Sequence, residues 1–413
     1  MQHQLLLLLL LALLATCRAA DENDREVHAF YYSWYRAPLP HEDGAPNSSA
    51  WAHWGHSILP HWTEAVRAQF PGAETRWLPP HDIHAPFYPA RGPYTSTDAA
   101  VARAQMADLR AHGVAAAVVS WWGRPGVSGG DSQGVLTDAA LQTALEACAA
   151  EGGIGVALHL EPYSGRSAQS VREDLEYLRE RYFAHPGLHR WRGRPVLYVY
   201  DSYHIAPAEW ARVLAPGGDL SVRGAPADAH FIGLWLERGH GSELRAGGFD
   251  GAYTYFAADG FSYGASSQHW PAMAAEAAAL GLLFAPSVGP GYDDSKIRPW
   301  NQAQVRERGA GGEYYAGMWA AALAARPALV GVTSYNEWGE GTQIEGAAPR
   351  ATDVERLAPL GLALPRETRE RLRLLPPLRE GYRDYGPRGP QMYMEMTASF
   401  AAQLRAQGGG AEL

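Results

Sequence analysis

Two carboxylates three positions apart are the strongest chemical signal in this chain of 413 residues. Glu337 and Glu340 lie in the segment TSYNEWGEGTQ, residues 333–343, among aromatic residues and two glycines. Glycines permit a turn, and a turn brings side chains three positions apart to about 5–6 Å between Cβ atoms. Carboxyl groups about 5–5.5 Å apart are typical of retaining glycoside hydrolysis, and about 6.5–9.5 Å of inverting hydrolysis. The pair therefore favours acid–base chemistry on a glycosidic bond, and the sequence leaves the separation open.

Other chemistries have weaker signals in the sequence. It contains no G-x-S-x-G nucleophile elbow, no phosphate-binding loop and no H-E-x-x-H helix. His81 and His84 are spaced as a metal pair could be, but no third ligand is evident, so surface or cleft histidines are favoured. Cys148 lies in an alanine-rich segment and is expected to pack in the core.

The composition of the chain indicates which classes of partner it can bind. The formal net charge of -9 argues against nucleic acid, which requires a basic face. Charged residues are 19% and hydrophobic residues 46% of the chain, so a large core can form. The 14 tryptophans and 21 tyrosines exceed what a core needs and suit clefts that bind sugar rings.

Strand-like and helix-like segments alternate along the chain, which predicts an α/β protein with a single (β/α)8 TIM barrel. The expected strands are residues 27–35, 115–122, 155–163, 195–203, 230–237, 251–256, 282–288 and 329–338. The expected helices are residues 98–112, 137–151, 168–183, 207–214, 241–246, 271–280, 313–325 and 392–406.

Two long segments interrupt this alternation. Residues 36–97 follow the first strand and residues 345–391 follow the eighth. Barrel enzymes build their sites from loops at the C-terminal face, so we expect both segments there. Whether the first of them acts as a lid is left open. The catalytic domain is expected to span residues 21–413.

Alternation along the strands predicts that polar side chains converge on the barrel axis at one end. On strand three, His159, Glu161 and Tyr163 share one face, while Val156 and Leu158 on the other face meet helices. The corresponding axial residues on the other strands are Tyr31, Ser33 and Tyr35, then Tyr253 and Tyr255, and finally Thr333, Tyr335 and Glu337.

The N-terminus indicates the secretory pathway. Residues 5–15 are apolar, a run of eleven that is too short for the about 20 residues needed to span a bilayer. Small residues and an acidic stretch follow, which predicts a signal peptide over residues 1–20, with an uncleaved signal anchor as the alternative. Asn47 begins the only N-x-S/T sequon, a candidate for glycosylation in the Golgi lumen or outside the cell.

Several motifs together resemble glycoside hydrolase family 99, the endo-α-1,2-mannosidases. They occur in order between about residues 27 and 349. The motifs are FYYSWY at 30–35, HWGH at 53–56, HLEPYS at 159–164, YVYDSY at 198–203, GFDG at 248–251, YTYF at 253–256, PSVGPGY at 286–292, IRPWN at 297–301 and NEWGEGTQIE at 336–345.

The resemblance implies a (β/α)8 barrel without a metal or organic cofactor. It implies cleavage of the α-1,2 bond between a glucose-capped mannose and the next mannose of a high-mannose N-glycan, free or on a glycoprotein. The substrate's own 2-hydroxyl would attack C1 to give a 1,2-anhydro sugar. Glu337 would be the base that assists this hydroxyl, and Glu340 the acid that protonates the leaving oxygen and later activates water.

The same resemblance and the strand pattern suggest the residues that bind sugar. They are Trp54, Trp122, Glu161, Tyr163, Tyr253, Tyr255, Arg298, Asn336 and Trp338. This chain departs from the animal Golgi members in its short N-terminal segment, where they carry a membrane anchor and stem. It also has Gly339 where we expect histidine in many animal members.

Two other functions stay open at this stage. A glycan-binding protein could keep the cleft and lack turnover, although a lectin needs no acid–base pair such as Glu337 and Glu340. Another barrel glycosidase could use a carboxylate nucleophile, and product stereochemistry with linkage analysis would distinguish it.

Overall fold

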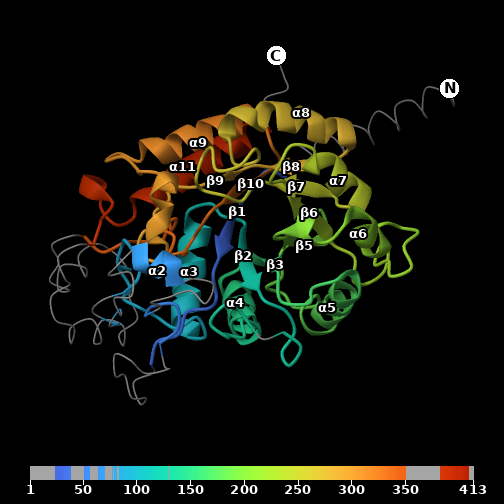
Figure 1. The fold of residues 1–413 in the computed structure, drawn as a ribbon, viewed down its shortest axis with the longest axis horizontal. Coiled ribbons are helices and arrows are strands. Elements are labelled where there is room, and N and C mark those ends of the chain that lie inside the picture. Colours follow the sequence, from blue (N-terminus) through green and yellow to red (C-terminus); the bar gives the residue numbers. More distant parts are fainter. Residues whose placement is uncertain are drawn as a thin grey trace, which may run out of the picture.

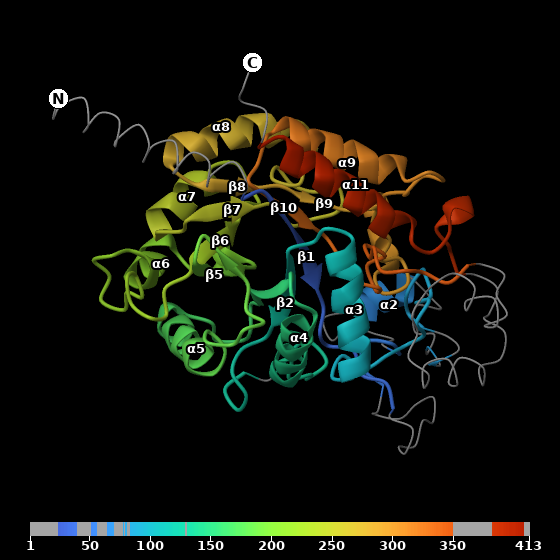
Figure 2. The ribbon, with the colours of Figure 1, turned by 180° about the vertical axis from the view of Figure 1, so that it is seen from behind.

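The computed structural model has a central parallel barrel with helices packed around it (Figures 1 and 2). The structure describes residues 24–38, 51–55, 64–69, 77, 79–80, 83–128, 130–349 and 382–408.

Within these residues, nine strands follow one another around the barrel in the order β8-β7-β6-β5-β3-β2-β1-β10-β9, and all pairs along this path are parallel. Their bounds are β1 Glu26–Tyr31, β2 Ala116–Trp121, β3 Gly155–Leu160, β5 Arg194–Val199, β6 His230–Leu234, β7 Gly251–Tyr253, β8 Leu283–Ala285, β9 Ser287–Val288 and β10 Leu329–Val332. All eight predicted strands are present, and the predicted barrel is confirmed.

The barrel closes through one predicted strand that is split into two. β8 pairs with β7, and β9 pairs with β10 on the other side. Pro286 separates the two halves and has no N–H to contribute to a ladder. Its carbonyl still accepts a hydrogen bond of 2.9 Å from the Gly331 amide, so the two edges remain joined at the break.

Helices cover the outside of the barrel as expected. The predicted helices correspond to α3 Ala99–Ala111, α4 Asp138–Glu151, α5 Ala168–Arg181, α6 Pro207–Leu214, α7 His240–Gly247, α8 Trp270–Leu280, α9 Glu313–Ala324 and α11 Met392–Ala406. Local signals fix some of their starts: the Asp98 side chain accepts from two amides of α3, and Ser167 with Ser170 forms a capping box on α5. The short helix α2, Glu64–Gln69, and the strand β4, Arg190–Trp191, were not predicted.

On strand three, His159 and Glu161 lie on the predicted side, but the predicted inward face of strand one is wrong. Tyr31 points outward and its hydroxyl donates to Gln105 of α3, 2.5 Å away. Phe30 instead lies inside the barrel, where its ring is 4.9 Å from that of His159. The face of β1 that carries Phe30 also carries Glu26 and His28, whereas Tyr31 shares the other face with Val27 and Ala29, so the predicted axial set was one residue out of register.

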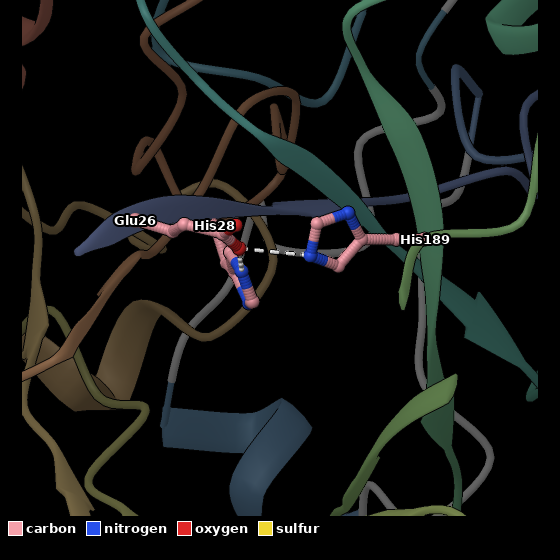
Figure 3. Close-up of side chains that lie close together, drawn as sticks. All are labelled: Glu26, His28 and His189. Carbon is pink, nitrogen blue, oxygen red and sulfur yellow. Dashed lines mark hydrogen bonds and ion pairs between the residues drawn. The ribbon is translucent and has the colours of Figure 1, made fainter. Parts of the chain in front are cut away.

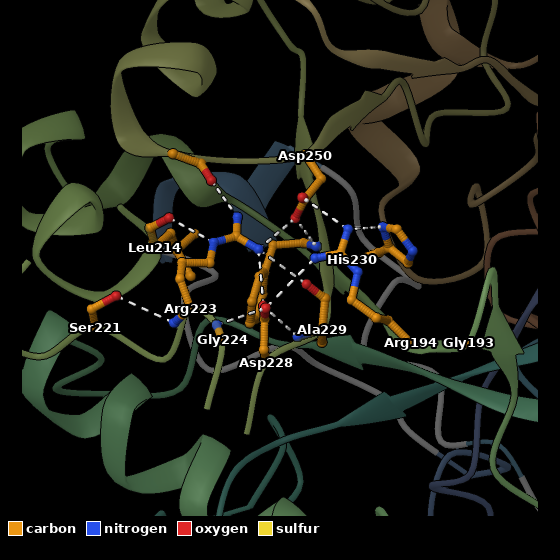
Figure 4. Close-up of polar contacts among 12 residues, drawn as sticks. Gly193, Arg194, Leu214, Ser221, Arg223, Gly224, Asp228, Ala229, His230 and Asp250 are labelled. Atoms are coloured by element: carbon orange, nitrogen blue, oxygen red, sulfur yellow. Dashed lines mark hydrogen bonds and ion pairs between the residues drawn. The ribbon is translucent and has the colours of Figure 1, made fainter. Parts of the chain in front are cut away.

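The ends of α6 and α7 are joined to the start of β6 by a network of charged side chains (Figure 4). Arg223 donates to the Leu214 carbonyl at 2.7 Å and pairs with Asp250 at 2.9 Å. Asp250 also accepts from the Phe231 amide at 2.9 Å, which fixes the first residues of β6. The network lies at the opposite ends of the strands from the cavity described below, and its satisfied geometry indicates a structural role.

Some sequence predictions lie outside the described residues. These are the N-terminal segment 1–20, Asn47 and His81. Among the residues that the structure describes, no helix has both the length and the apolar character to span a bilayer.

Candidate active site

A cavity of about 520 Å³ opens at the C-terminal ends of the strands. Tyr32 follows β1, Glu161 follows β3 and Thr333 follows β10, each directly after the last strand residue. The walls are formed by Tyr32, Trp34, Trp122, Ser132, Glu161, Pro162, Tyr200, Tyr255, Phe256, Ala257, Ala258, Phe261, Tyr292, Arg298, Trp300, Asn301, Gln304, Thr333, Glu337 and Glu340. The position agrees with the face that barrel enzymes use.

Both carboxylates of the sequence pair line this cavity. β10 ends at Val332, earlier than the predicted end near Trp338, and the chain then turns. The Gly341 amide donates to the Trp338 carbonyl at 3.2 Å, and Gly341 has a positive φ of 59° that favours glycine. The predicted turn is therefore present, and it places Glu337 and Glu340 on one side of the chain.

Among the described residues, hydrogen-bond donors reach only one of the two Glu337 side-chain oxygens. Its Oε1 accepts a hydrogen bond of 3.1 Å from the Gly339 amide. Its Oε2 is buried and has no hydrogen-bond partner among the described residues. Burial and the nearby charge of Glu340 raise the pKa of Glu337 well above its ordinary value, against the opposing effect of Arg298.

Glu340 has a cation beside it. Arg298 Nη1 donates to Glu340 Oε1 at 2.9 Å and also contacts Asp294 at 3.1 Å. Burial raises the pKa of Glu340, and Arg298 opposes this effect. The pKa values of both carboxyls are thus raised, that of Glu337 the more strongly. A pair of carboxyl groups with unequally raised pKa values is suited to acid–base catalysis.

Tyr255 is held in an unusual backbone conformation at the cavity wall. Its φ of 57° lies in the left-handed region, which costs a residue with a side chain of order 1–3 kcal/mol. Its amide donates to Ser287 Oγ at 2.9 Å, and its carbonyl accepts from the Thr333 hydroxyl. Its hydroxyl bonds that of Tyr32. The neighbouring strands thus impose the orientation of this ring.

Glu161 and Trp122 are joined through one serine. The Ser120 hydroxyl donates to Glu161 Oε1 at 2.7 Å and receives the Trp122 indole N–H at 3.1 Å. His159 Nδ1 lies 3.0 Å from the same Glu161 oxygen. These contacts fix a carboxylate and an indole on one wall, a combination that can bind hydroxyls and a sugar face.

Of the sequence-predicted site residues, six line the cavity: Trp122, Glu161, Tyr255, Arg298, Glu337 and Glu340. Three others lie behind the wall and meet at Tyr94. Trp54 donates to its carbonyl at 2.8 Å, and Asn336 and Trp338 donate to its hydroxyl at 3.1 and 3.4 Å. All three are fully buried, so their contacts indicate support for the Glu337 turn rather than contact with sugar.

Tyr163 and Tyr253 also lie away from the cavity wall. The Tyr163 hydroxyl bonds Asp174 of α5, on the outside of the barrel, because β3 ends before it and its alternation no longer applies. Tyr253 lies inside the barrel with its hydroxyl 2.8 Å from His159 Nε2. Tyr335, expected to face the axis, instead stacks on the outward-facing Tyr31 at 5.8 Å.

Sequence reasoning did not predict several aromatic residues that line the cavity. They are Tyr32, Trp34, Tyr200, Phe256, Phe261, Tyr292 and Trp300. Tyr32 and Tyr200 come directly after β1 and β5, and the others lie further along the loops. Six of the seven belong to the motifs FYYSWY, YVYDSY, YTYF, PSVGPGY and IRPWN, which were the available signal.

His84 lies beside Gly339, the residue between Glu337 and Glu340 in the turn. It is buried, and its Nε2 lies 3.1 Å from where a Cβ on Gly339 would be. Glu337 Oε1 lies 3.2 Å from the same point. A side chain at position 339 would therefore crowd both groups. Gly339 thus leaves room for the imidazole of His84, which comes from the loop that follows β1.

This geometry agrees with the comparisons with known proteins. The sequence matches the profile of glycosyl hydrolase family 99 over residues 22–358. The chain belongs to glycoside hydrolase family 99. A solved family-99 structure, the endo-alpha-mannosidase of Bacteroides thetaiotaomicron, matches with a TM-score of 0.75 and 34% identity, covering 93% of this chain and 98% of that one.

Relatives in animals carry two different names. This family-99 chain is 39% identical to the human glycoprotein endo-alpha-1,2-mannosidase-like protein over 381 residues, 91% of this chain and 75% of the human one. It is 38% identical to the rat glycoprotein endo-alpha-1,2-mannosidase over 396 residues, 93% of this chain and 77% of the rat one. The resemblance seen in the sequence motifs is thus confirmed at the level of the family.

Proposed function

We propose that this protein is a retaining endo-α-1,2-mannosidase that releases a glucosyl-mannose from glucosylated high-mannose N-glycans. The observation that carries the proposal is the pair Glu337 and Glu340, which lines one cavity with raised pKa values and one shared cation, Arg298. Aromatic residues on the other walls, such as Trp34 and Trp122, suit stacking on sugar rings.

The first step forms one bond and breaks one. In an α-mannoside the axial 2-hydroxyl is trans to the leaving oxygen, so its oxygen can attack C1 from the back. Glu337 takes the hydroxyl proton while Glu340 gives a proton to the departing glycosidic oxygen. The product on the cleaved side is a 1,2-anhydro sugar, and the oligosaccharide leaves with a free hydroxyl.

The second step reverses these roles. Glu340 removes a proton from water, whose oxygen attacks C1, and Glu337 returns a proton to the former 2-oxygen. Two inversions at C1 give net retention. The enzyme recovers its original charge because each carboxyl exchanges one proton in each direction.

Substrate must also place the proton for the first step. The pKa values of both carboxyls are raised, that of Glu337 the more strongly, whereas the first step needs the proton on Glu340. A 2-hydroxyl that donates to Glu337 Oε2 would favour the carboxylate there, because that oxygen has no donor among the described residues. The bound glycosidic oxygen would in turn accept a hydrogen bond from protonated Glu340.

A glycan-binding protein without turnover is the second candidate, because one set of relatives is named only endomannosidase-like. The acid–base pair in the cavity supports the enzyme instead, since binding alone requires no group held away from its ordinary pKa. The N-glycan substrate and the signal-like N-terminus support a site of action in the secretory pathway, in the Golgi lumen or after secretion.

The test is a product assay with matched variants. The chain, purified after secretory expression, is incubated with a monoglucosylated high-mannose N-glycan, and the products are weighed by mass spectrometry. We expect an intact glucosyl-mannose disaccharide from the wild type and almost none from Glu340→Gln. Release of free glucose would contradict endo cleavage. Tight glycan binding without any release would establish the binding protein instead.

A further inference from the structure

The barrel floor, at the N-terminal ends of the strands, holds a second cluster of ionisable side chains. Figure 3 shows the imidazoles of His28 and His189 approaching the carboxylate of Glu26. Glu26 Oε2 lies 2.9 Å from His28 Nε2 and 2.8 Å from His189 Nε2. This is the one group of three metal-ligand side chains found among the described residues whose ligand atoms all lie within 4.8 Å of one another.

Local structure places these three residues. Glu26 and His28 are two positions apart on β1, so their side chains lie on the same face. His189 comes just before β4, and its amide donates to the Val156 carbonyl of β3 at 2.8 Å. Gly155 permits this close approach, because a Cβ there would lie 2.7 Å from the His189 Cα.

The spacing is close to that of a tetrahedral zinc site. With bonds of 2.0–2.1 Å, ligand atoms in such a site lie about 3.4 Å apart. An ion between the three side chains would therefore need each contact with Glu26 to lengthen by only about 0.5 Å. Two imidazoles and one carboxylate are a set that favours Zn²⁺ over Ca²⁺ or Mg²⁺, which prefer oxygen ligands.

A neighbouring residue orients one of the imidazoles for this task. Tyr198 of β5 places its hydroxyl 2.8 Å from His28 Nδ1. When Nδ1 keeps its hydrogen and donates to this oxygen, the Nε2 lone pair is directed at the other two ligands. Partners of this kind fix the tautomer of metal-binding histidines.

Access to the cluster also suits an ion. The His28 side chain is fully buried, whereas those of His189 and Glu26 are 11% and 23% exposed. One side of the cluster is therefore open for entry and for a water as fourth ligand. The site is at the opposite end of the barrel from Glu337 and Glu340, where barrel residues contribute to stability rather than to chemistry.

We propose that Glu26, His28 and His189 bind one Zn²⁺, with water as the fourth ligand, and that the ion fastens the start of β1 to the segment before β4. Binding replaces the two N–H···O contacts with metal bonds, and each neutral imidazole then carries its hydrogen on Nδ1. The proposal is independent of the proposed hydrolase function.

Zinc titration of the untagged chain, stripped with a chelator and then dialysed, tests the proposal. We expect calorimetry to give one Zn²⁺ per chain with micromolar or tighter affinity, and the Tm to rise by several degrees. His189→Ala should lose at least tenfold in affinity and most of the Tm rise. His204→Ala removes an exposed histidine elsewhere and should behave as the wild type.

Cobalt and a second variant exclude indirect effects. Co²⁺ in place of zinc should give the strong visible absorption of a tetrahedral site in the wild type. Glu26→Gln keeps the side-chain size and should weaken both binding and this spectrum while the circular dichroism stays native. Absence of saturable zinc binding by the wild type would overturn the proposal. So would equal binding by the wild type and His189→Ala.

Discussion

The two ends of the barrel have opposite effects on the pKa of a carboxyl group. At the floor, burial alone would raise the pKa of Glu26, but hydrogen bonds from His189 and His28 more than offset this and lower it to about 2. At the mouth, burial and Glu340 raise the pKa of Glu337 well above its ordinary value. One carboxylate has two imidazole partners, and the other has an oxygen with no partner among the described residues.

The contrast separates residues that stabilise the fold from residues that react. A paired carboxylate lowers the free energy of the folded state, and a carboxylate left with an unused acceptor raises it. Such a cost is typical of active sites, where a group must be ready for a partner that is absent until substrate binds. The mouth is thus expected to control turnover and the floor to control stability.

The largest expected effect is on the two glutamates at the mouth. Glu337→Gln and Glu340→Gln should each lower kcat/KM for the glycan by about 10²–10⁴-fold, because each removes one proton-transfer group. A glucosyl-mannosyl fluoride, whose leaving group needs no acid, should restore fast fluoride release in the first turnover for Glu340→Gln only, because the second step still needs Glu340 as the base. Equal rescue of both variants would contradict the separate roles assigned to them.

The next largest effect on turnover is expected for Arg298, the cation beside the two glutamates. Arg298→Met should lower kcat by about 10–100-fold, because a charge-assisted hydrogen bond to Glu340 is lost. Arg298 lowers the pKa of both glutamates, so its removal should move the acidic limb of the pH–rate profile to higher pH. Arg212→Met, a surface change, is the control. An unmoved profile would show that Arg298 does not set these pKa values.

A smaller effect is expected at the glycine between the carboxylates. Gly339→His should lower kcat by about tenfold, because the new side chain meets His84 and Glu337. The exchange His84→Gly with Gly339→His should recover most of the rate, since one imidazole then occupies the space of the other. Steady-state kinetics of the two variants decide this point, and an exchange no better than Gly339→His alone would refute the spatial match.

The smallest effects on turnover should come from stability variants. In chelator-treated protein, Glu26→Gln should cost about 1–2 kcal/mol of unfolding free energy at neutral pH and leave kcat unchanged, because the histidines lose a charged partner. Glu337→Gln should instead stabilise the inactive protein by about 1 kcal/mol. Urea unfolding with circular dichroism measures both, and the same sign for the two would contradict the contrast.

The gain from Glu337→Gln should depend on pH in a defined direction. The raised pKa means that the folded state holds a proton that the unfolded chain gives up near the ordinary pKa of 4.5. As the pH rises from there toward the folded pKa, the unfolded wild type loses this proton while the folded wild type keeps it, so the free energy of unfolding of the wild type falls. The stability difference between Glu337→Gln and wild type should grow over that range.

The sequence predicted the elements well because strands and helices alternate with clear local signals. The eight strands and eight helices all exist, and helix starts such as Asp98 and Ser167 are fixed by their own side chains. The small strand β4 has only two residues, which is too short for a periodic signal. Pro286 could have predicted that this strand is split into β8 and β9, but the sequence prediction treated residues 282–288 as one strand.

The sequence predicted the two glutamates of the site, but it was less successful with the aromatic residues around them. The pair Glu337 and Glu340 was found because two charges beside aromatic residues at a strand end are chemically unusual. Trp54 and Trp338 were assigned to sugar, although they pack behind the wall against Tyr94. Alternation fails beyond a strand's last residue, and only the folded chain determines which aromatic ring faces the cavity.

Nuclear magnetic resonance of the reaction in progress would test the central claim most directly. The wild type is mixed with a monoglucosylated high-mannose N-glycan, and the anomeric signal of the released sugar is followed from the first turnover. The account predicts a glucosyl-mannose disaccharide that appears first as the α-anomer and then mutarotates. A β-anomer formed first, or no disaccharide at all, would contradict retaining endo cleavage by Glu337 and Glu340.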